Sequence, residues 1–296
     1  MNKRREFLKL SGNLLAGIAI VPAACKLMPK ENSNKATGLE TFGLQLYCLR
    51  NHIVKDPQGI LKQVASAGYK QVETYEMSNG LGLFAGMGNK AFSKLISDLG
   101  MSMPSAHTNV YQDFEKKADE LGAIGVTYII YAWEGPNKTL DDYRKMAEDF
   151  NKMGEYSKKV GMRFAFHNHE YSFKATDGIF PQDILTDRTD KNLVDFQMDH
   201  YWAVTGGQDP IVWINKHPER YKLSHFKDRV KGATERDGPA MCELGKGSID
   251  FQNILNKTKN SAIKYYTVDQ DNCNDRPDPI GCIKTDAEFM KTLIVS

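Results

Sequence analysis

Hydrophobic and polar positions follow two alternating patterns along most of this chain. Short runs rich in apolar and β-branched residues are followed by longer runs with apolar residues at helical spacing. The short runs predict strands at 42–47, 70–75, 101–106, 126–131, 161–167, 192–198, 221–226 and 264–268. The longer runs predict helices at 56–67, before Gly100, at 112–121, 139–159, 181–186, after Asp209, at 249–257 and at 284–293.

Eight strands that alternate with helices predict a (β/α)8 TIM barrel. Such a barrel needs about 250 residues, so a single domain over 39–296 accounts for the pattern. Asp56-Pro57 and Asp209-Pro210 each combine a capping carboxylate with a proline suited to the first helical position, which marks two helix starts.

Polar side chains collect where these strands end, most clearly in the stretch Phe164-Ala-Phe-His167-Asn168-His169. Strand side chains alternate, so His167 and His169 share one face and Asn168 takes the other. The carboxyl ends of barrel strands form the face that carries active sites. The alternative is a pair of hydrogen-bonded loop histidines.

Four strand ends supply metal-competent side chains: His167, Asp199, His225 and Asp269. Two imidazoles and two carboxylates suit one divalent ion such as Mn²⁺, Co²⁺, Zn²⁺ or Fe²⁺. Such an ion polarises a sugar carbonyl or hydroxyl and makes the neighbouring C–H acidic enough for a side-chain base. A structural polar network in the barrel mouth is the alternative.

Charge argues against a nucleic-acid partner. The net charge is +2, and the first 24 residues contribute Lys3, Arg4, Arg5 and Lys9 against Glu6, which leaves the remainder near −1. Nucleic-acid binding usually requires a basic surface. The histidine count of seven is also low for a trinuclear zinc nuclease.

The first 25 residues are expected to be a leader. A twin-arginine pair in Arg4-Arg5-Glu-Phe-Leu-Lys9 precedes an apolar run at 14–21, and this run is too short to span a membrane. The whole arrangement resembles a bacterial Tat signal. Ala23-Ala24-Cys25 leaves two readings open, a lipidated Cys25 that anchors the protein to a membrane or plain cleavage. Residues 26–38 are polar and are expected to form a tether, which predicts an exported, periplasmic or membrane-anchored protein.

Four further cysteines, Cys48, Cys242, Cys273 and Cys282, show no metal-binding spacing. An oxidising compartment permits a disulfide, and Cys273 and Cys282 are the nearest pair, with buried free thiols as the alternative.

Several motifs resemble the sugar phosphate isomerase/epimerase family of xylose-isomerase-like TIM barrels over nearly all of residues 41–293. They are Gly43-Leu-Gln-Leu-Tyr, Gly68-Tyr-Lys-Gln-Val-Glu, His167-Asn-His169, Asp199-His-Tyr-Trp, Asp209-Pro and His225-Phe-Lys-Asp228. The resemblance implies one metal held by Glu, Asp, His and Glu from strands five to eight, with the two glutamates also moving protons.

This sequence departs from that arrangement at both glutamates, which His167 and Asp269 replace. Both replacements are competent ligands, but a proton shuttle then needs another base, for which His169, Glu73 and His107 are the candidates. Glu76 also ends the second strand, and we expect Glu73 to point inward. One-base isomerisation or elimination is therefore favoured. In having a histidine at position 167, the chain resembles an exported branch of the family thought to include 3-keto-glycoside lyases and hydratases.

Five residues are candidates for substrate binding: Trp133, Glu134, Asn168, Trp202 and Lys227. Aromatic faces stack on sugar rings, although a lone Trp is more often part of a core or rim. Lys227 holds a substrate oxygen or pairs with Asp228.

The sequence therefore predicts a metal-dependent enzyme that acts on a small carbohydrate by proton abstraction beside a carbonyl. An isomerase or epimerase is the leading reading, and a keto-glycoside lyase or hydratase is its rival. A non-catalytic sugar-binding lipoprotein is the alternative of another class, and the oligomeric state is left open.

Overall fold

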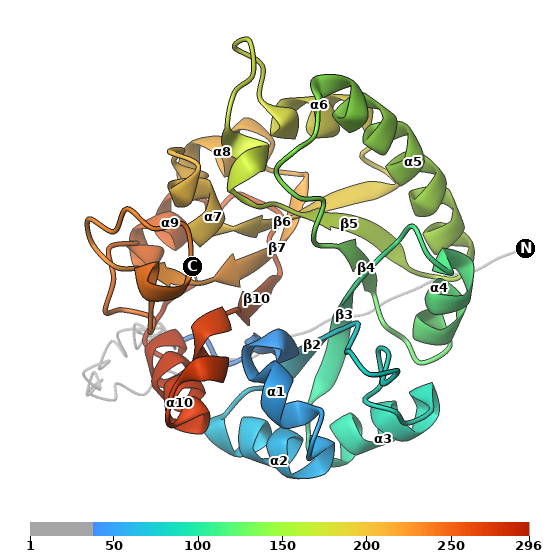
Figure 1. Ribbon diagram of the computed structural model, residues 1–296, viewed down its shortest axis with the longest axis vertical. Coiled ribbons are helices and arrows are strands. Elements are labelled where there is room, and N and C mark those ends of the chain that lie inside the picture. Colours follow the sequence, from blue (N-terminus) through green and yellow to red (C-terminus); the bar gives the residue numbers. More distant parts are fainter. Residues whose placement is uncertain (1–37, 296) are drawn as a thin grey trace, which may run out of the picture. The chain divides into compact units, whose positions relative to one another are not determined.

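The computed structural model describes residues 38–295, and the predicted leader, Cys25 and almost all of the tether lie outside the described residues. Within this range eight parallel strands close into a barrel, in the order β1-β10-β7-β6-β5-β4-β3-β2 (Figure 1). The strands are β1 Gly43–Gln45, β2 Gln71–Tyr75, β3 Ser102–Thr108, β4 Tyr128–Tyr131, β5 Arg163–His167, β6 Val194–Asp199, β7 Tyr221–Phe226 and β10 Tyr265–Val268. The predicted (β/α)8 barrel is confirmed.

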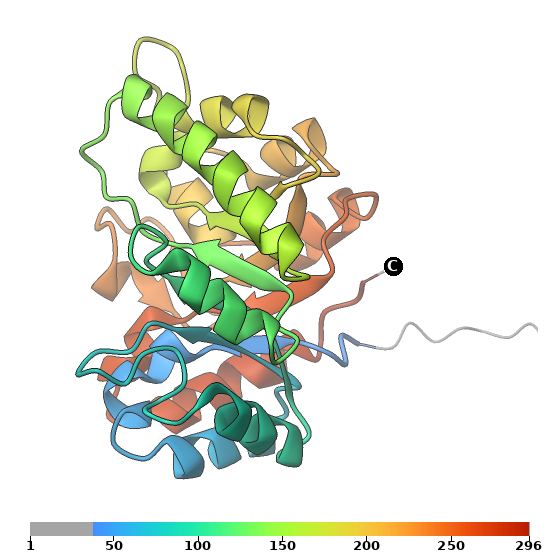
Figure 2. The same ribbon diagram turned by 90° about the vertical axis from the view of Figure 1, so that its right-hand side faces the viewer.

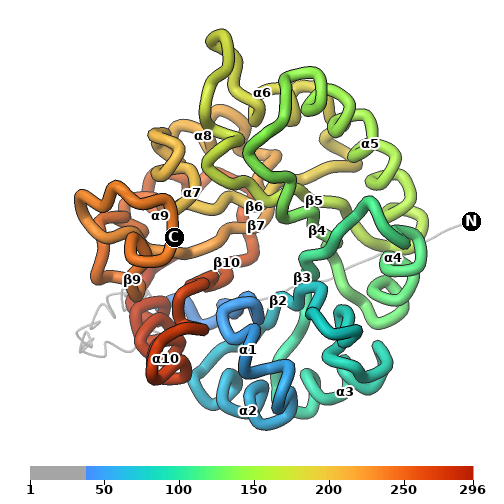
Figure 3. The backbone as a smooth tube through the Cα atoms, viewed as in Figure 1, coloured from blue at the N-terminus to red at the C-terminus, as the bar shows by residue number. Residues whose placement is uncertain are grey.

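The helices lie outside the strands and follow them around the barrel (Figure 2). They are α1 Arg50–Ile53, α2 Pro57–Ala67, α3 Asn89–Asp98, α4 Phe114–Gly122, α5 Leu140–Lys159, α6 Pro181–Arg188, α7 His200–Thr205, α8 Pro210–Lys216, α9 Phe251–Lys257 and α10 Pro279–Met290. Four short 3₁₀ turns complete the described part of the chain: η1 Leu46–Leu49, η2 Glu170–Phe173, η3 Gly238–Ala240 and η4 Asp271–Asp275. The backbone makes one circuit, so that the first strand pairs with the last (Figure 3).

Helix boundaries follow from local chemistry. Asp56 and Asp209 cap α2 and α8 by accepting backbone N–H bonds from Gly59 and Ile211, which satisfies donors that the helix cannot. Gly68 ends α2 at φ +106°, a left-handed conformation that glycine adopts without steric cost.

The structure differs from the sequence prediction in several details. The helices α1 and α7 were not expected; the Asp199 side chain caps α7 by accepting from the Trp202 N–H. The last helix begins at Pro279 rather than at 284, because Asp278-Pro279 repeats the capping signature of the earlier helices. The segment between the strand predicted at 221–226 and the helix predicted at 249–257 contains a small antiparallel pair, β8 Asp228–Arg229 and β9 Met241–Cys242.

The barrel interior changes from apolar to polar toward the carboxyl ends of the strands. Tyr128, Ile130, Ala165 and Leu223 form an apolar cluster, and Tyr265 packs against it. Because side chains alternate along a strand, His167 lies two residues beyond Ala165 on the same face, and His225 two beyond Leu223. The predicted polar strand ends therefore sit directly above this apolar layer.

A disulfide joins Cys273 of η4 to Cys282 of α10, one of the two states that the sequence left open for this pair. Cys48 and Cys242 are free and buried. Among the described residues, no helix has both the length and the apolar character needed to cross a membrane.

Candidate active site and metal centre

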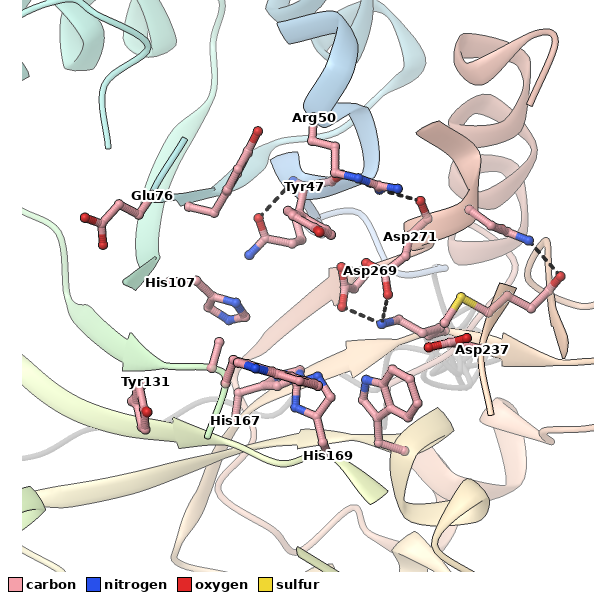
Figure 4. Close-up of a pocket in the computed structure, with 18 of the residues that line it drawn as sticks. Tyr47, Arg50, Glu76, His107, Tyr131, His167, His169, Asp237, Asp269 and Asp271 are labelled. Carbon is pink, nitrogen blue, oxygen red and sulfur yellow. Dashed lines mark hydrogen bonds and ion pairs between the residues drawn. The ribbon is translucent and has the colours of Figure 1, made fainter. Parts of the chain in front are cut away.

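A cavity of about 860 Å³ opens at the carboxyl ends of the strands. Figure 4 shows His107, His167 and His169 facing it from one side and Asp269 and Asp271 from the other. Its volume lies within the range of small-molecule sites, which is roughly 300–1,000 Å³.

The four predicted metal ligands converge beneath this cavity. His167, Asp199, His225 and Asp269 come from the ends of β5, β6, β7 and β10, and each contributes one ligand atom within 4.8 Å of the others. Asp199 Oδ2 lies 4.0 Å from His167 Nε2 and 4.0 Å from His225 Nδ1, which itself lies 3.2 Å from Asp269 Oδ2. Bonds of about 2.0–2.2 Å to one ion would hold such atoms roughly 3–4 Å apart.

Neighbouring side chains orient both imidazoles toward this centre. His167 Nδ1 donates to Gln197 Oε1 at 3.0 Å, which leaves the Nε2 lone pair facing Asp199. His225 Nε2 lies 2.7 Å from Glu73 Oε1, so its Nδ1 faces the two aspartates. A ligating histidine usually donates its other N–H to such an acceptor.

Asp199 provides the test of whether a metal ion fits. Its Oδ1 accepts from the Trp202 N–H at 2.9 Å, whereas its Oδ2 is buried without a hydrogen-bond partner among the described residues. A buried carboxylate oxygen left without a partner is costly. Together with the two imidazoles and the Asp269 carboxylate, it forms a donor set that fits a divalent cation.

Glu73 is the centre of a buried hydrogen-bond network below the ligands. It accepts from the side chains of Gln45, Ser105 and Gln197, and its Oε1 also lies 2.8 Å from His107 Nε2. Although burial raises the pKa of Glu73, His107 and His225 hold it well below its usual value. Glu73 points inward, as predicted, and stays ionised.

Charges near the metal ligands are strongly coupled. The Lys227 Nζ lies 2.8 Å from Asp269 Oδ2, 2.7 Å from Asp271 Oδ2 and 3.7 Å from Asp199 Oδ2. Burial lowers the pKa of His225, but Glu73 and Asp269 raise it to about 10. Burial raises the pKa of Asp199 to about 6 despite the opposing charge of Lys227.

His107 and His169 both line the cavity, in different environments. Glu73 and Gln197 accept at His107 Nε2, at 2.8 Å each, which fixes this ring through a carboxylate. Burial, together with the charges of Lys227 and Arg236, holds the pKa of His169 well below its usual value, so this ring is neutral.

Trp133, Trp202 and Lys227 also line the cavity, as substrate binding requires. Trp133 is 52% exposed, and its ring centroid lies 4.8 Å from that of His169, with the two rings nearly perpendicular. Trp202 is buried, and the Lys227 ammonium lies 5.1 Å from its ring centroid. These positions permit a sugar ring to contact an indole face.

Three predicted roles do not fit where the residues lie. Asn168 exchanges hydrogen bonds with the backbone of Asp199 and does not line the cavity, because it faces the opposite side of the strand end from His167. Glu134 also lies outside the cavity wall, held by the Tyr131 hydroxyl and the Lys138 ammonium. Glu73 is enclosed by its donors and is therefore a positioning group rather than a base in contact with substrate.

Sequence reasoning missed several residues of the cavity wall. It also assigned no role to Gln197, which does not line the cavity but bridges His107, His167 and Glu73. Other residues that the sequence did not single out come from loops and short turns, namely Tyr47, Arg50, Arg236, Asp237, Asp271 and Asp275. The run of acidic residues directly after the eighth strand was a usable signal for Asp271 and Asp275.

Comparisons with known proteins agree with this geometry. No family model matches the chain. An inosose dehydratase from Lacticaseibacillus casei is 28% identical over 168 residues, which cover 48% of this chain and 56% of that protein. The chain thus spans about half the length of the curated relatives it matches.

Solved structures match over nearly the whole barrel. A sugar phosphate isomerase/epimerase from Parabacteroides distasonis aligns with a TM-score of 0.72 at 24% identity and covers 92% of this chain and 98% of that one. An IOLI protein with a bound zinc atom aligns with a TM-score of 0.66 at 12% identity, covering 84% of this chain and 96% of that one. The chain therefore has the fold of the xylose-isomerase-like TIM barrels, as its motifs predicted.

Proposed function

We propose that this protein is a metal-dependent enzyme that acts on a carbohydrate by abstracting a proton next to a carbonyl. The observation that carries this proposal is the convergence of His167, Asp199, His225 and Asp269 beneath a cavity that His107 and His169 line. The likeness to inosose dehydratases and to a sugar phosphate isomerase/epimerase supports a sugar as the substrate.

The four ligands would hold one Mn²⁺, Co²⁺, Zn²⁺ or Fe²⁺ ion, which when bound supplies Lewis acidity to a substrate oxygen. The zinc in the IOLI neighbour supports a divalent ion in this kind of barrel. The Lys227 ammonium, beside Asp269, is placed to donate to a substrate oxygen on which negative charge develops.

A histidine of the cavity wall accepts the proton in this proposal. His107 has the stronger support, because Glu73 accepts at its Nε2 and so orients the ring in the cavity wall. His169 is neutral and also faces the cavity, which makes it the second candidate.

An elimination has a specific observation in its favour. The curated relatives are named dehydratases. His167 and Asp269 stand at the two strand ends where a two-base epimerisation would use glutamates. The lyase reading therefore stands beside the isomerase reading. Product analysis on a keto-glycoside separates them, because a lyase or hydrolase releases the aglycone and an isomerase or epimerase does not.

The test is exchange of a substrate C–H with solvent deuterium, measured on the metal-loaded protein with keto-sugars and keto-glycosides. Isomerase, epimerase and lyase chemistry all predict metal-dependent exchange that His107→Gln lowers by about 10²–10⁴-fold. His217→Gln, at the end of α8, is the control. Binding of sugars without any exchange would favour a non-catalytic binding protein.

We also propose that the chain is exported and that Cys25 anchors it to a membrane. The Arg4-Arg5 pair, the apolar run after it and the small residues before Cys25 support this proposal. Cell fractionation with mass analysis of the mature N-terminus tests it. Replacing both arginines by lysine should retain the precursor in the cytoplasm, and Cys25→Ser should release an exported protein from the membrane.

A further inference from the structure

Cationic side chains of the cavity wall are all paired with carboxylates. Among the described residues, the lysine and arginines that line the cavity are Arg50, Lys227 and Arg236. Each pairs with a carboxylate outside the four-residue metal set, and these three carboxylates line the same cavity. The pairs are Arg50–Asp275 at 3.1 Å, Lys227–Asp271 at 2.7 Å and Arg236–Asp237 at 2.6 Å.

The two arginines also donate to other protein groups, Arg50 through Nη1 and Arg236 through Nε. Arg50 Nη1 donates to the carbonyl oxygens of Tyr47 and Asp271, and its guanidinium lies over the Tyr47 ring at 4.6 Å (Figure 4). Arg236 Nε donates to Glu170 at 2.6 Å, and its guanidinium lies 4.5 Å from the Trp202 ring centroid. Arg236 Nη2 is buried without a hydrogen-bond partner among the described residues. Each pair of neighbouring nitrogens that could bind a phosphate or carboxylate side-on therefore includes one that already donates to the protein.

The balance of charge points the same way. Outside the metal set, the carboxylates of Glu76, Asp237, Asp271 and Asp275 line the cavity with the three cations. All of them line one cavity, so an anion that enters it meets their repulsion. Such pairs contribute little to stability at exposed positions, and Asp237 and Asp275 are 58% and 64% exposed. These ion pairs can instead contribute to specificity, because their carboxylates repel an anionic ligand.

We propose that the cavity selects an uncharged polyhydroxy carbonyl compound over a phosphorylated or acidic sugar. Asp237, Asp271 and Asp275 are the specificity-determining residues, because each occupies a cation that would otherwise bind the anionic group. The proposal rests on the proposed function in taking the ligand to be a carbohydrate. It goes further by excluding the phosphate esters that structural neighbours of the barrel are named for.

The experiment measures binding of fructose 6-phosphate and inorganic phosphate to the full, metal-loaded chain by calorimetry. We expect wild-type protein to show no arginine-dependent binding below about 1 mM. Asp275→Asn should gain about tenfold or more in affinity for both probes, and adding Arg50→Ala should remove the gain. Asp177→Asn, which removes an exposed carboxylate that does not line the cavity, is the matched control and should gain nothing.

Two results would refute the proposed selectivity for an uncharged ligand. One is wild-type affinity for fructose 6-phosphate tighter than about 1 mM that Arg50→Ala or Arg236→Ala abolishes. The other is an Asp275→Asn protein with unchanged affinity for both probes. Neither readout depends on turnover, so an absence of deuterium exchange would refute the proposed function while a gain in Asp275→Asn would still support the selectivity.

Discussion

His225 Nε2 lies 2.7 Å from Glu73 Oε1, a contact that joins a candidate metal ligand on β7 to a buried carboxylate on β2. The bond leaves His225 Nδ1 directed at Asp199 and Asp269. A carboxylate in this position fixes the tautomer of the imidazole and increases its basicity as a ligand.

Glu73→Gln should therefore lower the affinity for the divalent ion by about 10–100-fold, because an amide accepts less strongly than a carboxylate. Competition with a metal chelator measures the affinity. Glu76→Gln is the control, since Glu76 also follows this strand but bonds to Thr108, Asn109 and Lys117. Equal affinities in the two variants would refute the orienting role of Glu73.

Thr139 begins the long helix α5 with a capping box, in which its hydroxyl accepts from the Asp142 N–H and the Asp142 carboxylate accepts from the Thr139 N–H. Thr139→Ala should lower the free energy of unfolding by about 1 kcal/mol, measured by urea denaturation. Thr234→Ala, on an exposed loop, provides the baseline, and a matching loss there would show that the cap is not responsible.

The strand ends were predictable from sequence because a parallel barrel brings the carboxyl ends of its strands to one face. His167, Asp199, His225 and Asp269 needed only their place at a strand end to be grouped, and the structure brings them together. The sequence also predicted that Glu73 points inward, because alternation along β2 decides this.

The connections across the barrel were not predictable in the same way. Gln197 donates to Glu73, 124 residues away, and that contact depends on barrel closure and on side-chain rotamers rather than on any local pattern. Arg236 reaches the cavity from the loop between β8 and β9, whose path the strand pattern does not set. For the same reason Asn168 and Glu134 were assigned to the substrate, although neighbouring protein groups hold both side chains.

The disulfide ties η4, which carries Asp271 and Asp275, to α10 across a sequence separation of 9. Closing a loop of this length lowers the entropy of the unfolded chain, so replacing both cysteines by alanine should cost about 2–3 kcal/mol of unfolding free energy. Urea denaturation with and without dithiothreitol measures the cost. Reductant should destabilise wild-type protein and leave the double variant unchanged, whereas equal stability of both oxidised proteins would contradict the prediction.

Asp286, in α10, gives a prediction about pH. Burial, with Glu243 adding to it, raises the pKa of this carboxyl from 3.8 to about 7 in the folded state. Between those values the unfolded chain loses a proton that the folded chain keeps, so the free energy of unfolding falls as the pH rises from about 4 to about 7 and is then level.

Asp286→Asn removes this titration and should keep the one bond that the structure shows to Oδ1, donated by the Leu244 N–H at 2.8 Å. Wild-type stability should therefore decline relative to Asp286→Asn by roughly 2–4 kcal/mol between pH 4 and pH 7. Urea denaturation of both proteins across this range measures the difference. A constant difference would mean that Asp286 titrates alike in the folded and unfolded chains. A difference of the opposite sign would mean that the hydrogen bond from the Leu244 N–H stabilises the carboxylate by more than burial destabilises it.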